Sequence, residues 1–432
     1  MRDLLRELIL DFQRRPPDTG VPRRLTVEPV RGKAVVCVGA RRSGKTTWVA
    51  QIAAARADAE RSNLLYVNFF DERLCDLWSD GRRLGDVVEA YYSLYPAKRG
   101  AEMVHCFFDE IQVVPHWEPF VDRLLRTERC QVYLTGSSAQ MLAAEVATQM
   151  RGRSLMVELF PFSFAEYLSA QGLAEGPLTS VRRAAVESAF HGYWETGGFP
   201  EVRTVQPATR VAIHQDYLHA VCLRDVVERH GVHHPRAVRD LALRLVNNVA
   251  GLHTVNKLTA YLQSLGHKAP KSAVAEYLDW FEDAYFFFAV RLFDASQSRQ
   301  NANPRKVYAV DHALARSCGT GVLVNSGHLL ENLVFATLRR AVRQVHYYRT
   351  RTGKEVDFVW RDGADRVQLV QVCETLAADA VRQREFGALA EAMDETGATG
   401  ATVVTRGEAE NTEVGGRPVA VTPFWRWALA RE

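Results

Sequence analysis

The chain has 432 residues, of which 47% are hydrophobic, and this is enough apolar material for more than one core. Its 54 Lys and Arg residues nearly balance its 51 Asp and Glu residues, so the net charge of +3 neither requires nor excludes a polyanionic partner. The seven cysteines form no CxxC pair and no Cys/His group with zinc-ligand spacing, which is typical of buried thiols in a reducing compartment.

The N-terminal segment has apolar residues at helical spacing, but charged residues interrupt any signal-peptide core. Nowhere does an apolar stretch reach the length of about 18 residues that a membrane-spanning helix needs. We therefore expect a soluble, cytoplasmic protein that does not interact with membranes.

Up to residue 158, short apolar stretches alternate with helical ones. Such stretches are predicted to be buried parallel strands, because they are short and mostly apolar. The alternation predicts a doubly wound α/β domain over residues 1–158, preceded by an N-terminal helix. The predicted strands are 34–38, 64–69, 104–108 and 131–135.

Over residues 159–300 the strand signal fades and the apolar spacing becomes helical. Three helix candidates are separated by turns that contain Gly or Pro, as in a helix-turn-helix or winged-helix unit. Lys268, Lys271 and Ser272 would then lie at the start of the third helix, where phosphates or base edges could be contacted. The alternative is a linker of three packed helices. The three candidates are 238–250, 254–265 and 271–281.

From residue 301 the alternation returns and predicts a second, smaller α/β domain over residues 301–432. Its predicted strands are 307–310, 345–348, 355–360, 367–372 and 402–405, and its predicted helices are 329–342 and 381–393.

A phosphate-binding motif directly follows the first predicted strand. Residues 39–46 fit the pattern GxxxxGK[ST], and a helix-compatible stretch comes next. Glycines allow backbone N–H groups to surround phosphates, Lys45 offers a charge to the β and γ phosphates, and the Thr46 hydroxyl can hold Mg²⁺. The motif therefore predicts ATP and Mg²⁺ as cofactors. The predicted nucleotide-binding residues are Gly39, Ala40, Arg41, Arg42, Ser43, Gly44, Lys45, Thr46 and Thr47.

Two adjacent acids end the predicted strand 104–108. Asp109 is placed to reach Mg²⁺ with Thr46, and Glu110 is placed to polarise the attacking water. The second acid predicts hydrolysis as well as binding. A strand cap is the alternative, but the phosphate-binding motif independently requires such acids.

The next predicted strand ends in hydroxyl residues that could orient the water near the γ phosphate. Thr135, Ser137 and Ser138 are the candidates, and we assign the role to Ser137. An ordinary turn is the alternative.

An arginine supplied by a neighbouring subunit could stabilise the charge that develops on the transferred phosphoryl group. Arg153 is our choice for this catalytic role, together with Arg151. Arg126, Arg129 and Arg224 are the further candidates, and solvated surface arginines are the alternative.

These motifs resemble a large group of prokaryotic AAA-type ATPases that carry a C-terminal domain of unknown function, whose fold is similar to restriction endonucleases. The resemblance implies ATPase activity and a homo-oligomeric ring, such as a hexamer, in which a neighbour's arginine completes each site. It covers nearly the whole chain. The matching stretches are 39–47, 108–112, 134–138, 152–153, 161–167, 197–200, 217–218, 223–225 and 307–311.

The C-terminal domain resembles the PD-(D/E)xK nuclease core. In an active nuclease of this kind, acids equivalent to Glu331 and Asp357 would hold Mg²⁺, and a (D/E)xK triplet would complete the site. Here the triplet ends the strand as Gln371, Val372 and Cys373, and cysteine cannot replace the lysine ammonium. We therefore expect a degenerate site that has lost DNA cleavage.

Basic residues around this domain, with two tyrosines among them, predict contacts to phosphates and stacked bases. A solvated basic face that binds nothing is the alternative. The residues are Arg339, Arg340, Arg343, Tyr347, Tyr348, Arg349, Arg351 and Lys354.

The layout therefore favours an ATP-driven motor that binds duplex or branched DNA and remodels it, for example at a four-way (Holliday) junction by branch migration. A nucleotide switch that regulates a protein partner is one alternative. An active metal-dependent nuclease that borrows a lysine such as Lys354 is another.

Overall fold

The computed structural model describes residues 2–15, 17–57, 61–74, 78, 83–136, 150, 152–173, 176–319 and 325–431. The chain divides into two compact units, Met1–Pro161 and Phe162–Glu432. Each unit has its own sheet, and each is considered by itself below.

A parallel sheet of five strands forms the centre of the N-terminal unit, in the order β2-β3-β4-β1-β5. This confirms the predicted α/β class of the unit. The strand β5 was not predicted, because it lies at the sheet edge, is only half buried and carries polar residues at both ends. The strands are β1 (Ala34–Val38), β2 (Leu64–Asn68), β3 (Val104–Asp109), β4 (Cys130–Thr135) and β5 (Ser154–Glu158).

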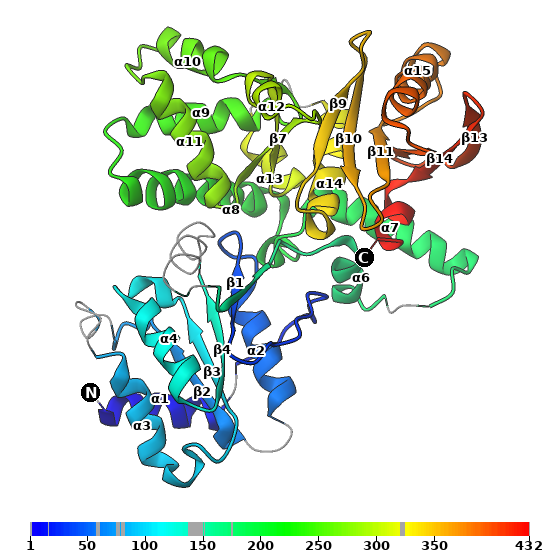
Figure 1. The fold of residues 1–432 in the computed structure, drawn as a ribbon. Helices are drawn as coiled ribbons and strands as arrows, with labels where there is room; N and C mark the ends of the chain where they lie inside the picture. The colour runs from blue at the N-terminus through cyan, green and yellow to red at the C-terminus, as the bar shows by residue number, and fades with distance from the viewer. Residues whose placement is uncertain are drawn as a thin grey trace. The chain divides into compact units, whose positions relative to one another are not determined.

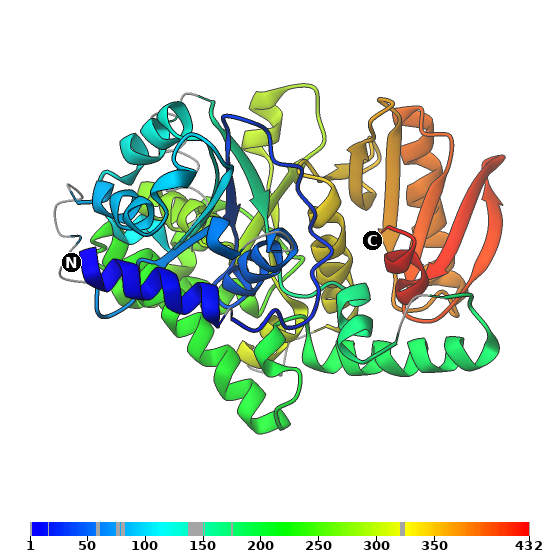
Figure 2. The ribbon, with the colours of Figure 1, turned by 90° about the horizontal axis from the view of Figure 1, so that it is seen from below.

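Helices cover both faces of this sheet, and Figure 1 shows α2 and α4 on opposite sides of the strands. The N-terminal helix α1 packs beside α3, as both ribbon views show (Figures 1 and 2), and its Phe12 ring stacks on Tyr66 at 4.3 Å. The helices are α1 (Arg2–Arg14), α2 (Lys45–Arg56), α3 (Gly85–Leu94) and α4 (Trp117–Thr127), with short 3-10 turns at Arg61–Asn63, Pro96–Lys98 and Ile111–Val113.

The second unit begins with helices and continues into a three-stranded antiparallel sheet. Strand β8 lies between β6 and β7. The three predicted short helices correspond to α9, α10 and α11. The elements up to this point are α6 (Phe164–Ala170), α7 (Ser180–Thr196), η5 (Pro200–Val202), α8 (Pro207–Ala220), the π-helical η6 (Val221–Glu228), α9 (Pro235–Val246), β6 (Leu252–His253), α10 (Val255–Ser264), α11 (Lys271–Asp283), β7 (Phe287–Leu292), α12 (Gln297–Ala302) and β8 (Arg305–Ala309).

The sheet does not stop at the boundary predicted near residue 300, because β7 pairs with β9 and so continues into the C-terminal strands. The whole sheet has nine strands in the order β13-β14-β12-β11-β10-β9-β7-β8-β6. The remaining elements are α13 (His312–Cys318), α14 (Ser326–Ala341), β9 (His346–Arg349), β10 (Glu355–Arg361), β11 (Val367–Val372), α15 (Asp379–Thr396), β12 (Ala401–Thr405), β13 (Glu410–Val414), β14 (Arg417–Pro423) and α16 (Phe424–Leu429).

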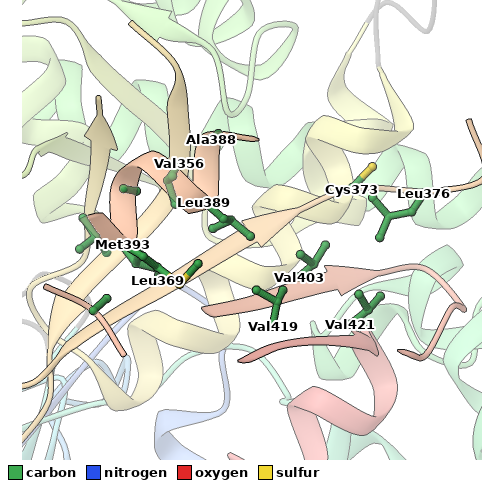
Figure 3. Close-up of a cluster of buried hydrophobic side chains, with 13 residues drawn as sticks. Val356, Leu369, Cys373, Leu376, Ala388, Leu389, Met393, Val403, Val419 and Val421 are labelled. Carbon is green, nitrogen blue, oxygen red and sulfur yellow. The ribbon is translucent and has the colours of Figure 1, made fainter. Parts of the chain in front are cut away.

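A buried aliphatic cluster holds α15 against the C-terminal strands, and Figure 3 shows its side chains meeting between the helix and the sheet. Burial of such side chains stabilises by about 1.5–3 kcal/mol each, so this part of the sheet has a core of its own. The labelled members are Val356, Leu369, Cys373, Leu376, Ala388, Leu389, Met393, Val403, Val419 and Val421.

Candidate functional site

The loop between β1 and α2 has a backbone that only certain residues can adopt. Gly39 has a φ of 149°, and a Cβ atom there would lie 2.1 Å from the Leu159 carbonyl oxygen. Gly44 has a φ of 96° and immediately precedes α2. The loop therefore wraps tightly around the start of α2, where the unpaired N–H groups and the helix dipole favour an anion.

Lys45 lies inside this loop with only 6% of its surface exposed. Its ammonium donates to the carbonyl oxygens of Gly39 and Ala40, at 3.1 and 2.9 Å, and burial lowers its pKa. The Ser43 hydroxyl is fully buried and has no hydrogen-bond partner among the described residues. A buried cation, an unpaired hydroxyl and a helix N-terminus together fit a phosphate group.

Three hydroxyl groups converge on the buried carboxylate of Asp109, which ends β3. The hydroxyls of Thr46 and Tyr66 donate to Oδ2 at 2.9 and 3.0 Å, and the Thr135 hydroxyl donates to Oδ1. Burial is the main cause that raises the pKa of Tyr66, so its hydroxyl keeps the proton it donates. Thr46 and Asp109 together present the oxygen ligands that Mg²⁺ prefers.

Glu110 follows Asp109 in a left-handed conformation with a φ of 54°. Its backbone N–H donates to the Thr135 hydroxyl at 3.0 Å, and its carboxylate accepts from the Gln112 amide. A left-handed backbone conformation is uncommon for residues other than glycine. At Glu110 it turns the side chain away from the direction of the strand.

The order of the strands explains why Thr135 reaches both acids. Strand β4 pairs with β1 on one side and with β3 on the other, so its end lies between the phosphate loop and Asp109. The other two candidates for this role, Ser137 and Ser138, lie outside the described residues, so the assignment to Ser137 stays a prediction.

We predict that Thr135→Val lowers ATP turnover by about tenfold, because it removes a donor to Asp109 and leaves the Glu110 N–H without its acceptor. Steady-state ATPase kinetics would measure the effect. Thr127→Val is the matched control, since its hydroxyl caps the last turn of α4 and contacts neither acid. If Ser137→Ala abolished turnover while Thr135→Val had no effect, the role would belong to Ser137.

Arg153 lies at the end of the sheet where β1 and β5 begin, whereas the phosphate loop lies at the opposite end of these strands. It precedes β5, which runs parallel to β1, whereas the loop follows β1. Strand β1 has five residues, so its two ends are about 15 Å apart. Arg153 is 41% exposed and lies 3.3 Å from Asp122. It therefore cannot serve the phosphate loop of its own chain from this position.

The other arginine candidates are placed as follows. Arg126 pairs with Asp122 at 2.7 Å, and Arg129 donates to the Ala101 carbonyl oxygen at 2.8 Å. Arg224 is exposed on η6 in the second unit. Arg151 lies outside the described residues.

In the second unit, the two acids predicted for a degenerate nuclease site do come together. Glu331 on α14 and Asp357 on β10 both accept from the ammonium of Lys306, at 2.8 Å each. Sequence comparison with the nuclease pattern did not point to Lys306. The available signal was a lysine inside the apolar strand β8, where a buried charge requires partners.

Lys354 is not the lysine of this group, which corrects the suggestion that it could be borrowed. Its ammonium pairs with Glu391 at 2.5 Å, on the surface. Gln371 lies beside Asp357 and accepts its backbone N–H at 3.2 Å. Cys373 packs in the aliphatic cluster of Figure 3, which suits a small apolar residue.

The two tyrosines predicted to stack on bases are held elsewhere. Tyr347 is 2% exposed and donates to the Pro304 carbonyl oxygen at 2.7 Å, so its ring cannot receive a base. Tyr348 donates to Glu395 at 2.7 Å and packs against the aliphatic cluster. The sequence could not show this, because the burial of these tyrosines depends on which strands and helices pack against β9.

The parallel sheet, the glycine loop that leads into α2 and the acids on the neighbouring strand define a P-loop nucleotide-binding domain. A family model described as an AAA domain matches residues 31–168, which gives this domain its type. Two models described as domains of unknown function, DUF8612 and DUF4143, match residues 187–322 and 326–427. The chain thus combines an AAA-type P-loop domain with two regions of unassigned role.

Two curated relatives match most of this chain, and both are described as uncharacterized proteins. The chain is 29% identical to the uncharacterized protein MJ1544 of Methanocaldococcus jannaschii, over 95% of this chain and 91% of that protein. It is 28% identical to an uncharacterized protein of Haemophilus influenzae, over 78% of this chain and 81% of that protein.

Solved structures give a weaker likeness. Cdc6p from Pyrobaculum aerophilum matches with a TM-score of 0.28 and 14% identity, over 68% of this chain and 93% of that chain. AMPPCP-bound DnaA from Aquifex aeolicus matches with a TM-score of 0.26 and 10% identity, over 64% and 86%. The class of the domain rests on its own sheet and loop and on the AAA family model.

Within the part of the chain that the structure describes, no helix is both long enough and apolar enough to cross a membrane.

Proposed function

We propose that this chain is an AAA-type ATPase that hydrolyses ATP with Mg²⁺. The observation that carries the proposal is the convergence of Thr46, Thr135 and Tyr66 on Asp109, beside the buried ammonium of Lys45. Bound Mg²⁺ would neutralise charge on the β and γ phosphates, and Thr46 and Asp109 would hold it.

The residues of the chain divide the remaining work. Lys45 exchanges its two backbone acceptors for phosphate oxygens, while the N–H groups at the start of α2 bind the same phosphates. Glu110 accepts the proton of the attacking water, and Thr135 fixes the position of Glu110 through its backbone N–H. The proposal fails if the purified chain binds ATP but releases no phosphate above the rate without enzyme at any Mg²⁺ concentration.

We further propose that the ATPase acts on DNA, either duplex or branched DNA such as a four-way junction. The elements α9, β6, α10, α11, β7, α12 and β8 follow one another as in a winged helix with a short helix inserted before its last strand, and the pairing of β8 with both other strands supports this proposal. Lys268, Lys271 and Ser272 are exposed at the start of α11, where such a unit contacts phosphates. The rest of α11 carries acids, so contact would be limited to this end.

ATPase rates with and without single-stranded, duplex and junction DNA would test the DNA proposal. We expect DNA to stimulate turnover and to bind with an affinity that falls steeply as salt is raised. The double variant Lys268→Ala, Lys271→Ala should lose both effects, whereas Lys354→Ala should keep them because that ammonium already pairs with Glu391. If no DNA changed the ATPase rate and subunit assembly depended on the bound nucleotide, a switch that acts on a protein partner would be favoured instead.

We propose that Arg153 acts on the nucleotide of a neighbouring subunit in a homo-oligomeric ring, such as a hexamer. Two observations support this role: Arg153 lies at the end of the strands opposite to its own phosphate loop, and its side chain is partly exposed. Arg153→Ala should lower kcat by about 100-fold and leave ATP affinity unchanged, because one donor to the developing charge is lost.

Mixing tests the trans arrangement. The Lys45→Ala chain keeps Arg153, and the Arg153→Ala chain keeps an intact phosphate loop, so a mixture should recover activity that neither variant has alone. Arg126→Ala is the control, since Arg126 shares the partner Asp122 and is also exposed. Full activity of Arg153→Ala, or no recovery on mixing, would remove Arg153 from the site.

A further inference from the structure

In the second unit, one ammonium group lies at the centre of a buried set of carboxyl groups. Lys306 Nζ lies 2.8 Å from Glu331 Oε1, 2.7 Å from Glu355 Oε1 and 2.8 Å from Asp357 Oδ1. The Lys306 side chain is 3% exposed. Carboxyl oxygens that converge on one point from a helix and a strand are how proteins hold a hard divalent cation.

We propose that the Lys306 ammonium takes the place of a divalent cation in this acidic site, and that it fastens the β6-β7-β8 sheet to α14 and β10. The site formed by Lys306, Glu331, Glu355 and Asp357 is called the lysine site below. In the native chain it excludes divalent cations, and removal of the lysine converts it into a divalent-cation site.

The charges require a cation at this point. Glu331 and Asp357 are almost fully buried, and carboxylates that face one another away from water repel strongly. Burial acts to lower the pKa of Lys306, but the carboxylates of Asp357 and Glu331 hold it well above its ordinary value.

The same strand that carries Lys306 makes further contacts with α14, which explains the fastening role. The Tyr308 hydroxyl donates to Glu331 at 2.6 Å. The Asn332 side chain accepts the Ala309 N–H at 2.7 Å and donates to the Ala309 carbonyl oxygen at 3.0 Å. Strand β8 is therefore held to α14 at three positions along its length, with Lys306 as its charged contact.

The Asp357 carboxyl group and its strand are also held by contacts that do not involve Lys306. Asp357 Oδ2 accepts the Val372 N–H at 2.9 Å, and Gln371 donates to Glu385 at 2.7 Å while accepting the Asp357 N–H. Removal of the lysine should therefore leave the oxygens in place, as outer contacts do around metal ligands. The Glu355 side chain is 31% exposed and gives an ion a path from solvent.

The distances favour a large cation. The three N–O distances of 2.7–2.8 Å are close to the Ca²⁺–oxygen distance of about 2.3–2.6 Å and further from the Mg²⁺ distance of about 2.0–2.1 Å. Among the described residues, no group of three or more His, Cys, Asp or Glu side chains is arranged to hold a metal as it stands.

Calcium titration of the full chain, without nucleotide, tests the proposal by calorimetry. The native chain and the Asp357→Asn chain should release the same heat when Ca²⁺ is added. Lys306→Ala should bind one additional Ca²⁺ per chain, at least tenfold more tightly than it binds Mg²⁺ at the same site, and the double variant Lys306→Ala, Asp357→Asn should lose it. Lys306→Ala should melt roughly 5–10 °C lower than the native chain, and Ca²⁺ should restore much of this loss.

Lys354→Ala is the matched control, because it also removes a lysine from an ion pair, but one at the surface. It should gain no Ca²⁺ and change the melting temperature little. If Lys306→Ala is insoluble, the triple variant Lys306→Met, Glu331→Gln, Asp357→Asn should recover a folded chain, because the charges are then removed together.

Four results would overturn the proposal. One is a native chain that binds Ca²⁺ or Mn²⁺ in a way that Asp357→Asn abolishes. Another is metal-dependent DNA cleavage that Lys306→Ala and Asp357→Asn both remove, which would make Lys306 a catalytic residue. The third is a folded Lys306→Ala that gains no Ca²⁺, and the fourth is a triple variant that stays unfolded.

Discussion

Lys45→Ala is expected to abolish measurable ATP binding. The buried ammonium contacts two carbonyl oxygens of its own loop, so the variant loses both the charge for the phosphates and two hydrogen bonds that shape the loop. A charge-assisted contact to phosphate is worth about 1.5–3 kcal/mol, which corresponds to a loss of about tenfold to more than 100-fold in affinity before the loop is considered. Titration with a fluorescent ATP analogue measures the dissociation constant.

Lys33→Ala is the control for this variant. Lys33 directly precedes β1, whereas Lys45 follows the loop at the other end of the same strand. The control should therefore bind ATP as the native chain does. Lys45→Met, which keeps much of the side-chain length without the charge, should behave like Lys45→Ala. Native affinity in either Lys45 variant would show that the triphosphate binds elsewhere.

Glu110→Gln is expected to bind ATP with native affinity and to lower turnover by about 1000-fold, within a range of about 10²–10⁴. The amide keeps the shape and the contact with Gln112, but it cannot take a proton from water. Single-turnover phosphate release, measured beside the dissociation constant, separates the chemical step from binding.

Glu102→Gln provides the matched isosteric change. Glu102 lies two residues before β3 begins, its side chain is 46% exposed and it pairs with Lys98, so the same substitution there should leave turnover unchanged. If Glu110→Gln turned over ATP normally, Glu110 would be the cap of β3 and not the base. If it lost ATP binding as well, the charge of the Glu110 carboxylate would be needed to form the site and not only to take a proton from water.

The two expected results have different consequences for the rest of the chain. The Glu110→Gln chain should bind ATP without hydrolysing it, so it provides the nucleotide-bound state for measurements of DNA binding and assembly. The Lys45→Ala chain supplies the nucleotide-free state. Comparison of the two chains shows whether DNA binding or subunit assembly depends on the bound nucleotide. This comparison does not depend on the lysine site of the second unit.

Much of the N-terminal unit could be predicted from the sequence because the signals are local. An apolar strand, a glycine loop and a helix follow one another directly, so the phosphate loop can be recognised from consecutive residues. The strands β1 to β4 are mostly apolar, which makes them recognisable without knowledge of their neighbours. Strand β5 lacks that signal, since it is half exposed at the edge.

The sequence by itself thus determined the phosphate loop, the two acids and the α/β class, because each depends on neighbours along the chain. Tertiary structure alone decided that Thr135 contacts both acids, since this follows from the position of β4 between β1 and β3. It also decided that Lys306 meets Glu331 and Asp357, which lie 25 and 51 residues away. Contacts between distant residues depend on how strands and helices pack, and a side chain's type does not reveal which partner the packing brings to it.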